Sequence, residues 1–266
     1  MDAFAILPLV NLERRRDGMR RWLLFVLPVL AWSLCAAALL TAPSAVPVDV
    51  PLPVEETPAP SSTPSGGLIA LTFDDGPRRS TTTALLDGLA ARGVQATFFL
   101  IGKQVAEYNQ DLLQRMDAEG HQIGIHTYDH VMLSGLNAAD FSAQVDKTRS
   151  LFQSILGHNG FLLRPPYGST DPAVRSMAGC PIILWSIDPE DWDDQNADRV
   201  VEHVVSRAKD GDIILLHDIF PTSVEAALRI VDQLHARGFY FVTVEELFAA
   251  RHITLEPGKV YRCAYP

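Results

Sequence analysis

Short apolar runs alternate with amphipathic stretches from Gly67 onward, at the spacing of repeated βα units. The apolar runs predict seven strands, at Leu68–Phe73, Ala96–Ile101, Gln122–Ile125, Phe161–Leu163, Pro181–Ile187, Asp212–Leu216 and Tyr240–Val244. The stretches with helical periodicity predict helices at Thr82–Arg92, Gln104–Glu119, Ala138–Leu156, Asp171–Met177, Ala197–Lys209, Thr222–Arg237 and Glu245–Ala250. This alternation predicts an α/β fold with a mostly parallel sheet. The strand count leaves open whether the sheet closes into a barrel or stays open and doubly wound.

The chain before Gly67 has a different pattern. Residues 1–21 carry a cluster of arginines, and residues 22–42 are uncharged and long enough, at about 20 residues, to cross a bilayer as a helix. This order predicts a basic flank in the cytoplasm and export of the rest. Two alternatives stay open, a retained signal anchor or a cleaved signal peptide, and translation could also start at Met19. We expect a single-pass membrane protein with its domain outside the cell, or a secreted protein.

A proline-rich segment, residues 43–66, follows the apolar stretch. From Pro43 to Gly67 the chain has seven prolines and no aromatic or basic residue, so it cannot bury enough apolar surface to fold. We expect an extended spacer that leads into a single domain at residues 67–266.

Charge narrows the classes of partner. The chain has 22 basic and 32 acidic residues; residues 1–66 hold 5 and 6 of them, which leaves 17 and 26, net −9, from Gly67 onward. An acidic domain argues against a nucleic acid as binding partner, because nucleic acids bind to basic surfaces. A neutral polymer is compatible with this charge. Cys180 and Cys263 could pair outside the cell, but two cysteines do not make a disulfide framework. We expect a monomer.

Five short polar clusters each follow directly on an apolar run. They are Thr72–Pro77, His126–His130, Arg164–Gly168, Asp188–Trp192 and Leu215–Asp218. Barrels and open α/β sheets both gather ligands at the C-terminal ends of their strands, so we expect these clusters to meet there. They contain residues that bind metals and move protons, which indicates a metal-dependent hydrolase.

The candidates for metal binding are Asp75, His126 and His130. The two histidines are four residues apart, so on a helical turn both imidazoles would project from one face. With the carboxylate of Asp75 they leave coordination positions for water and substrate, as catalytic zinc sites do. Asp74 and Asp75 would point to opposite sides of a strand unless the chain turns, and the Gly-Pro pair that follows predicts this turn.

Other cluster residues suit proton transfer. His217 ends a predicted strand, where an imidazole can protonate a leaving nitrogen or oxygen. Asp191 and Asp188 would raise the pKa of His217 by favouring the imidazolium. Arg164 would keep a base carboxylate ionised. Each role requires a proximity that only the folded chain provides.

The prolines before Tyr167 make a stiff segment, because they fix φ and remove backbone donors. The first free backbone N–H after them belongs to Tyr167, which makes it a candidate oxyanion donor. Trp192, which lies among aspartates, is expected to line a groove for sugar rings. Trp185 lies in an apolar run, and we expect it in the core.

Taken in order, the five clusters resemble the motifs of the polysaccharide deacetylases with a NodB-homology domain, carbohydrate esterase family 4. The resemblance covers about residues 67–250, and no catalytic position departs from the pattern. It implies an irregular (β/α)7-type barrel with fewer than eight strands. The choice that the strand count left open is thereby resolved in favour of a barrel.

The resemblance also implies three sets of site residues. Those that would perform the chemistry are Asp74 as general base, His217 as general acid, Arg164, Asp191 and Tyr167. Those that would bind the metal are Asp75, His126 and His130. Those that would contact the substrate are Pro166, Trp192 and Leu215. The implied ion is divalent, with zinc expected and cobalt or nickel as alternatives.

These expectations describe an N-deacetylase that hydrolyses acetamide groups on a polymer of N-acetylglucosamine and releases acetate. We expect peptidoglycan as the polymer, because the tether keeps the domain near the cell wall, with a chitin-like glycan as the neighbouring choice. Two alternatives stay open. The domain could be an O-acetyl esterase on an acetylxylan-type polysaccharide, or a glycan-binding module without activity.

Overall fold

The computed structural model describes residues 66–193 and 195–265. The predicted segments at 1–21 and 22–42, and the spacer up to residue 65, lie outside the described residues. Within the described part, none of the helices has the length and apolarity needed to cross a bilayer.

In the described part of the chain, eight strands form one sheet, and the pairings between these strands are parallel. The hydrogen-bonded order is β6-β1-β2-β3-β4-β5-β8, and β7 pairs with the first half of β1. The strands are β1 (Gly67–Asp74), β2 (Thr97–Leu100), β3 (Gln122–Ile125), β4 (Leu162–Leu163), β5 (Ile182–Ile183), β6 (Ile213–His217), β7 (Phe239–Phe241) and β8 (Val260–Tyr261).

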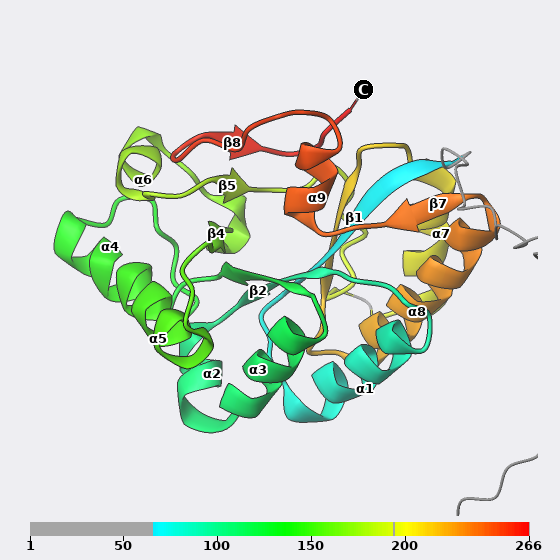
Figure 1. The fold of residues 1–266 in the computed structure, drawn as a ribbon, viewed down its shortest axis with the longest axis horizontal. Coiled ribbons are helices and arrows are strands. Elements are labelled where there is room, and N and C mark those ends of the chain that lie inside the picture. Colours follow the sequence, from blue (N-terminus) through cyan, green and yellow to red (C-terminus); the bar gives the residue numbers. More distant parts are fainter. Residues whose placement is uncertain (1–65, 194, 266) are drawn as a thin grey trace, which may run out of the picture. The chain divides into compact units, whose positions relative to one another are not determined.

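The sheet curls into an irregular barrel (Figure 1). The chain that continues after β5 approaches β6, where Ile187 forms a parallel bridge with Ile214. The Leu215 N–H donates to the Ile187 carbonyl at 3.0 Å, so the segment after β5 closes against β6 at the other side of the sheet. The α/β class and the irregular parallel barrel predicted from the sequence are confirmed, but the expectation of fewer than eight strands was wrong, since the described residues form eight.

Helices cover the outside of the sheet, apart from α9 (Val244–Ala249), which packs with the interior core (Figure 1). They are α1 (Arg79–Ala90), α2 (Gly102–Tyr108), α3 (Gln110–Ala118), α4 (Ala138–Gln144), α5 (Asp146–Leu156), α6 (Pro172–Met177), α7 (Ala197–Arg207), α8 (Pro221–Ala236) and α9 (Val244–Ala249). Two stretches predicted as single helices are each divided. The first divides at Asn109, whose φ is −135° and whose side-chain amide donates to the Gln104 and Pro77 carbonyls. The second divides at Val145.

Side chains alternate along β1 between two hydrophobic cores. Ile69, Leu71 and Phe73 pack into the layer between sheet and helices. Ala70 faces the barrel interior, where it packs with residues from other strands and from α9, among them Phe99, Leu162, Ile183, Ile213, Leu247 and Phe248. Asp74 has the same parity as Ala70 and is buried, so the interior becomes polar toward the C-terminal end of β1.

Two sequence predictions about strands were wrong. The strand expected at Pro181–Ile187 is only two residues long, because the chain beyond Ile183 turns toward β6. β8, which pairs with β5, was missed because its two residues lie between Lys259 and Arg262 and make no apolar run.

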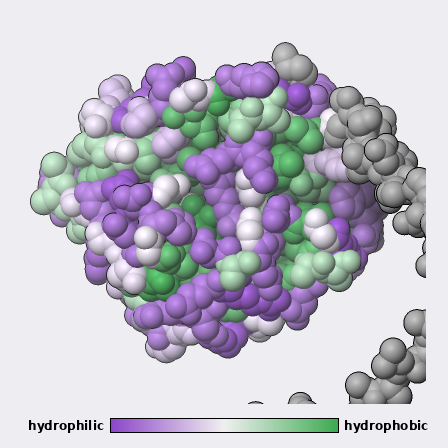
Figure 2. Space-filling model, viewed as in Figure 1, coloured by the Kyte–Doolittle hydropathy of each residue, from purple (hydrophilic) through white to green (hydrophobic). Residues whose placement is uncertain are grey.

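Cys180 and Cys263 are free thiols. On the face shown in Figure 2, hydrophilic residues surround smaller hydrophobic patches.

Candidate active site

A turn at the end of β1 brings two adjacent carboxylates to one place. Asp75 has a φ of 72°, and the peptide bond between Gly76 and Pro77 is cis. A Cβ on Gly76 would lie 2.3 Å from Asp218 Oδ1, so this position requires glycine. As a result, Asp74 Oδ2 and Asp75 Oδ1 lie 3.7 and 3.4 Å from the same atom, His126 Nε2. The predicted turn is present.

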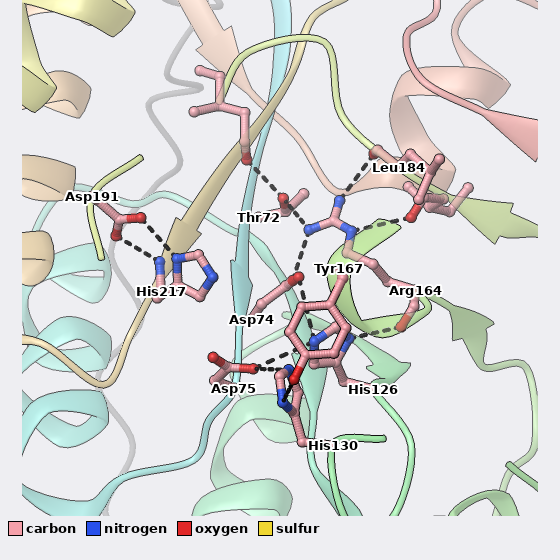
Figure 3. Close-up of polar contacts among 12 residues, drawn as sticks. Thr72, Asp74, Asp75, His126, His130, Arg164, Tyr167, Leu184, Asp191 and His217 are labelled. Atoms are coloured by element: carbon pink, nitrogen blue, oxygen red, sulfur yellow. Dashed lines mark hydrogen bonds and ion pairs between the residues drawn. The ribbon is translucent and has the colours of Figure 1, made fainter. Parts of the chain in front are cut away.

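Asp75, His126 and His130 form the cluster of potential metal ligands (Figure 3). Asp75 Oδ1 lies 3.1 Å from His130 Nε2 and 3.4 Å from His126 Nε2. Neither contact has hydrogen-bond geometry, and this buried oxygen has no donor. Ligands placed about 2.1 Å from a tetrahedral ion lie about 3.4 Å apart, so the three donor atoms fit a divalent ion.

The remaining nitrogens of the two imidazoles support this assignment. His126 Nδ1 lies 2.7 Å from the Arg164 carbonyl, which can only accept, so Nδ1 carries the proton and the Nε2 lone pair points toward Asp75. A backbone carbonyl in this position is typical of histidines that bind metals. With no metal ion bound, burial favours a neutral Asp75, but attraction to protonated imidazoles at His126 and His130 would outweigh this and hold its pKa far below the usual range. The contact with Asp75 raises the pKa of His130.

His126 and His130 do not lie on a helical turn, which their spacing had suggested. They begin and end an irregular loop after β3, and Thr127 and His130 have φ values of 64° and 57°. The i, i+4 spacing is therefore accommodated by a loop with two left-handed residues rather than by a helix.

Asp74 is held by Arg164, which is fully buried. Arg164 Nη1 lies 2.8 Å from Asp74 Oδ1 and also donates to Thr72 Oγ1. Its other nitrogens donate to the Ile183 and Leu184 carbonyls at 3.1 Å. The guanidinium stacks 4.0 Å above the ring of Phe99. This arginine is fixed on every side, and Oδ2 of Asp74 stays free to face the cavity.

His217 lies at the end of β6 and is paired with the buried Asp191 (Figure 3). The Nδ1–H of His217 donates to Asp191 Oδ1 at 2.7 Å, and the His217 backbone N–H donates to Oδ2 at 2.8 Å. Burial opposes the charged imidazolium, but the hydrogen bond and the negative charges of Asp191, Asp74 and Asp75 outweigh it and raise the pKa to about 9. Asp188, expected to share this role, instead accepts from the Glu190 N–H.

The cluster residues surround a cavity of about 410 Å³. It is lined by Asp74, Asp75, His126, His130, Tyr167, Trp185, Asp188, Trp192, Leu215, His217 and Phe220. A larger cavity of about 520 Å³ lies between the chain around Ser186 and α7, and it shares only Asp188 with the first. The smaller cavity is the candidate active site, because it holds the titratable clusters.

The predicted substrate residues are placed unequally. Trp192, half exposed, and Leu215 line the cavity, whereas Pro166 is buried and does not. Trp185, predicted to lie in the core, is half-buried and lines the cavity, because β5 ends before it. Phe220 was missed. The signal that could have found it is its position three residues after His217, directly before the proline that begins α8.

Tyr167 lies in a 3₁₀ turn, Pro166–Gly168, with a φ of 61°. Its ring packs edge-on against His130, and its hydroxyl lies 3.5 Å from His130 Nδ1. Among the described residues, the Tyr167 backbone N–H has no backbone acceptor. This donor stays available to a group bound in the cavity.

Comparison with known proteins agrees with this geometry. The family model described as polysaccharide deacetylase matches residues 61–179. The chain is 37% identical over 193 residues to a peptidoglycan-N-acetylglucosamine deacetylase of Bacillus cereus, which covers 70% of this chain and 90% of that protein. The chain belongs to the polysaccharide deacetylase family.

Two further members of the family extend the comparison. Peptidoglycan-N-acetylmuramic acid deacetylase PdaC of Bacillus subtilis is 40% identical over 198 residues, which cover 74% of this chain. The chain spans about two fifths of the length of PdaC, since the match covers 41% of it. A family 4 acetyl xylan esterase from Clostridium thermocellum, solved with a cobalt ion, has a TM-score of 0.71 and 30% identity, and the match covers 75% of this chain and 100% of that one.

Proposed function

We propose that this chain is a metal-dependent N-deacetylase that hydrolyses acetamide groups on the amino sugars of peptidoglycan and releases acetate. One observation carries the proposal. A carboxylate fixed by a buried arginine, a histidine fixed by a buried aspartate, and a cluster of three potential metal ligands surround the same cavity. Binding of a glycan alone requires no such pairing of a base carboxylate with an acid histidine.

Asp75, His126 and His130 would hold the ion. We propose zinc, with cobalt or nickel as alternatives, because two imidazoles and one carboxylate are a donor set of catalytic zinc sites. When bound, a divalent ion polarises an acetamide carbonyl and makes nearby water more acidic. The remaining roles belong to the side chains and backbone of this chain.

Asp74 acts as the general base. Its Oδ1 accepts a hydrogen bond from Arg164, which fixes the carboxylate in place, and Oδ2 accepts the proton of the attacking water. The water oxygen forms a bond to the carbonyl carbon. The Tyr167 N–H donates to the oxygen that gains negative charge, as an oxyanion-hole donor does.

His217 acts as the general acid. With Nδ1–H bound to Asp191 and a pKa of about 9, the imidazole is protonated at neutral pH and presents Nε2–H as the second donor. The carbon–nitrogen bond breaks as Nε2 gives its proton to the amine nitrogen. The products are acetate and a free amino sugar.

The apolar side of the cavity suits a sugar ring. Trp185, Trp192, Tyr167 and Phe220 supply aromatic faces, and the buried Leu215 offers an apolar contact for the acetyl methyl group. The names of the Bacillus subtilis and Bacillus cereus relatives point to N-acetylmuramic acid and N-acetylglucosamine respectively. We propose an N-acetylated sugar of peptidoglycan as the substrate, with chitin oligomers as a further substrate class.

We also propose that the enzyme works at the cell envelope as a monomer. Residues 22–42 would anchor it in the membrane or direct its secretion, residues 43–66 would act as a spacer, and the domain at 67–266 would face the wall. Cell fractionation with an antibody against the domain tests this; recovery of the domain from the cytosol would contradict it.

The test of function is acetate release by the full-length chain from peptidoglycan, chitin oligomers and acetylxylan in parallel. We expect release from the first two, loss of it in Asp74→Asn, and retention in the control Asp111→Asn, which makes the same change at an exposed carboxylate on α3. A chelator should abolish release and added zinc should restore it.

The likeness to the acetyl xylan esterase favours a second candidate, an O-acetyl esterase. Release from acetylxylan alone would establish that candidate in place of the first. Binding of zinc and glycan without release of acetate from any of the three polymers would contradict both.

A further inference from the structure

The loop between His126 and His130 adopts an unfavourable backbone. Thr127 has a φ of 64° although it is β-branched, and His130 has a φ of 57°. Thr127 is fully buried, and its hydroxyl has no hydrogen-bond partner among residues 66–193 and 195–265. Such a conformation persists only where the surroundings impose it. Contacts from outside the loop must therefore determine where the two imidazoles lie.

The start of α2 supplies one set of contacts. The backbone N–H groups of Gly102 and Lys103 donate to the Thr127 and Tyr128 carbonyls at 2.9 and 3.0 Å. A Cβ on Gly102 would lie 2.8 Å from the Tyr128 ring, so the helix and the loop are in close contact. These bonds fix the carbonyl groups of Thr127 and Tyr128. The N–H groups of Tyr128 and Asp129 are left for another partner.

Gln144, the last residue of α4, is that partner. Its Oε1 accepts from the Tyr128 and Asp129 N–H groups at 3.0 and 2.9 Å. Its Nε2 donates to Asp129 Oδ2 at 3.2 Å. One side chain thus makes three hydrogen bonds to the two central residues of the loop. An amide satisfies this set, because its oxygen accepts from the two N–H groups and its NH₂ donates to the carboxylate.

Gln144 is itself well anchored. Its backbone carbonyl accepts from the hydroxyl of Thr148, a buried residue one turn further along. It is not among the residues that line the cavity, and its side-chain hydrogen bonds go to the loop. Any influence on the site must pass through the loop.

We propose that Gln144 is a positioning residue for the metal ligands. By holding the peptide groups between His126 and His130, its amide keeps His130 Nε2 at 3.1 Å from Asp75 Oδ1. The inference rests on the metal site of the proposed function. It adds a residue outside the five clusters whose effect is on metal affinity.

Three variants of the full-length chain test the proposal. Gln144→Met keeps the size and removes all three hydrogen bonds. Gln144→Glu keeps the acceptor for the two N–H groups but places a second carboxylate against Asp129. The double variant Gln144→Glu with Asp129→Asn restores the hydrogen bond between the side chains at 144 and 129, which the asparagine now donates and the glutamate accepts. Gln153→Met, at an exposed position of α5, is the matched control.

The readout is affinity for zinc alone, measured by competition with a chromogenic chelator, together with the melting temperature of the metal-free protein. We expect Gln144→Met to weaken zinc binding roughly 10- to 100-fold, as loss of a residue that orients a ligand does. Gln144→Glu should weaken it less, and the double variant should return toward wild type. Gln153→Met should bind zinc as the wild type does.

The outcomes are separable. Wild-type affinity in Gln144→Met overturns the proposal, and so does a double variant that binds no better than Gln144→Glu. Equal losses of zinc affinity and of metal-free stability in all Gln144 variants, without rescue, indicate a structural role and also overturn it. Zinc binding that follows the expected order in a chain that releases no acetate supports the inference and contradicts the proposed function. A wild-type chain that binds none of zinc, cobalt and nickel overturns both.

Discussion

Replacing Asp191 by asparagine removes the charge that holds His217 protonated. Asp191 is 1% exposed and accepts from both the imidazole Nδ1–H and the backbone N–H of His217. Asparagine has nearly the same size, but only its amide oxygen accepts, so one of the two hydrogen bonds from His217 is lost. The negative charge beside the half-buried imidazole is lost with it. Burial, which favours the neutral ring, is then opposed only by the carboxylates of Asp74 and Asp75.

The size of the effect follows from the pKa. His217 has a pKa of about 9 against an ordinary value of 6.5, a difference of about 3 kcal/mol between its two protonation states. If the variant returns to about 6.5, the protonated fraction at pH 8 falls from about 90% to about 3%, so a step that needs the imidazolium slows roughly 30-fold. At pH 6 both proteins are mostly protonated, and this contribution is less than about twofold.

Two measurements check this prediction. NMR titration of the His217 ring in the chelator-treated chain should show a midpoint near 9 in the wild type and at or below 6.5 in Asp191→Asn. The alkaline limb of the acetate-release profile should move to lower pH in the same variant. Asp193→Asn, an exposed aspartate of the same loop, is the control. A His217 midpoint in Asp191→Asn within half a unit of wild type would refute the reasoning.

Two further predictions concern buried charges. Arg164→Met leaves Asp74 buried without its partner and should lower the free energy of unfolding by about 3–5 kcal/mol in urea titrations. Adding Asp74→Asn to this variant should recover part of the loss. An Arg164→Met protein as stable as the wild type would contradict the prediction. Burial raises the pKa of Asp218 to about 7. Between about pH 4 and 7 the folded chain therefore keeps a proton on Asp218 that the unfolded chain releases. The free energy of unfolding falls as the pH rises through this range. In Asp218→Asn, the difference in unfolding free energy between pH 4.5 and 7.5, measured by urea titration, should be smaller than in the wild type. An equal difference in both proteins would contradict the prediction.

The strands and the order of the clusters could be predicted because their signals are local. An apolar run followed by a polar cluster marks a strand end wherever the strand is long, as for β1 and β6. The same signal fails for β8, because two residues make no run. It also fails for Trp185, since nothing local shows that β5 ends after Ile183.

The residues that sequence reasoning missed have no chemical signal of their own. Gln144 is an ordinary helix residue until α4 places its amide beside Tyr128, 16 positions earlier in the chain. Phe220 is an ordinary helix-start residue until β6 and α8 place it at the cavity. The helical turn assumed for His126 and His130 was wrong, because an i, i+4 spacing also fits a loop held from outside.

The sequence by itself determined the α/β class, the order of five polar clusters and the residue types able to bind a metal and move protons. These depend on side-chain periodicity and residue chemistry, which act over a few positions. The tertiary structure decided which nitrogen of His126 faces Asp75, how Arg164 reaches Asp74 across 90 positions, and why His217 is held protonated. Those properties depend on burial and on distances of about 3 Å between distant segments, over which hydrogen bonds and charges act strongly.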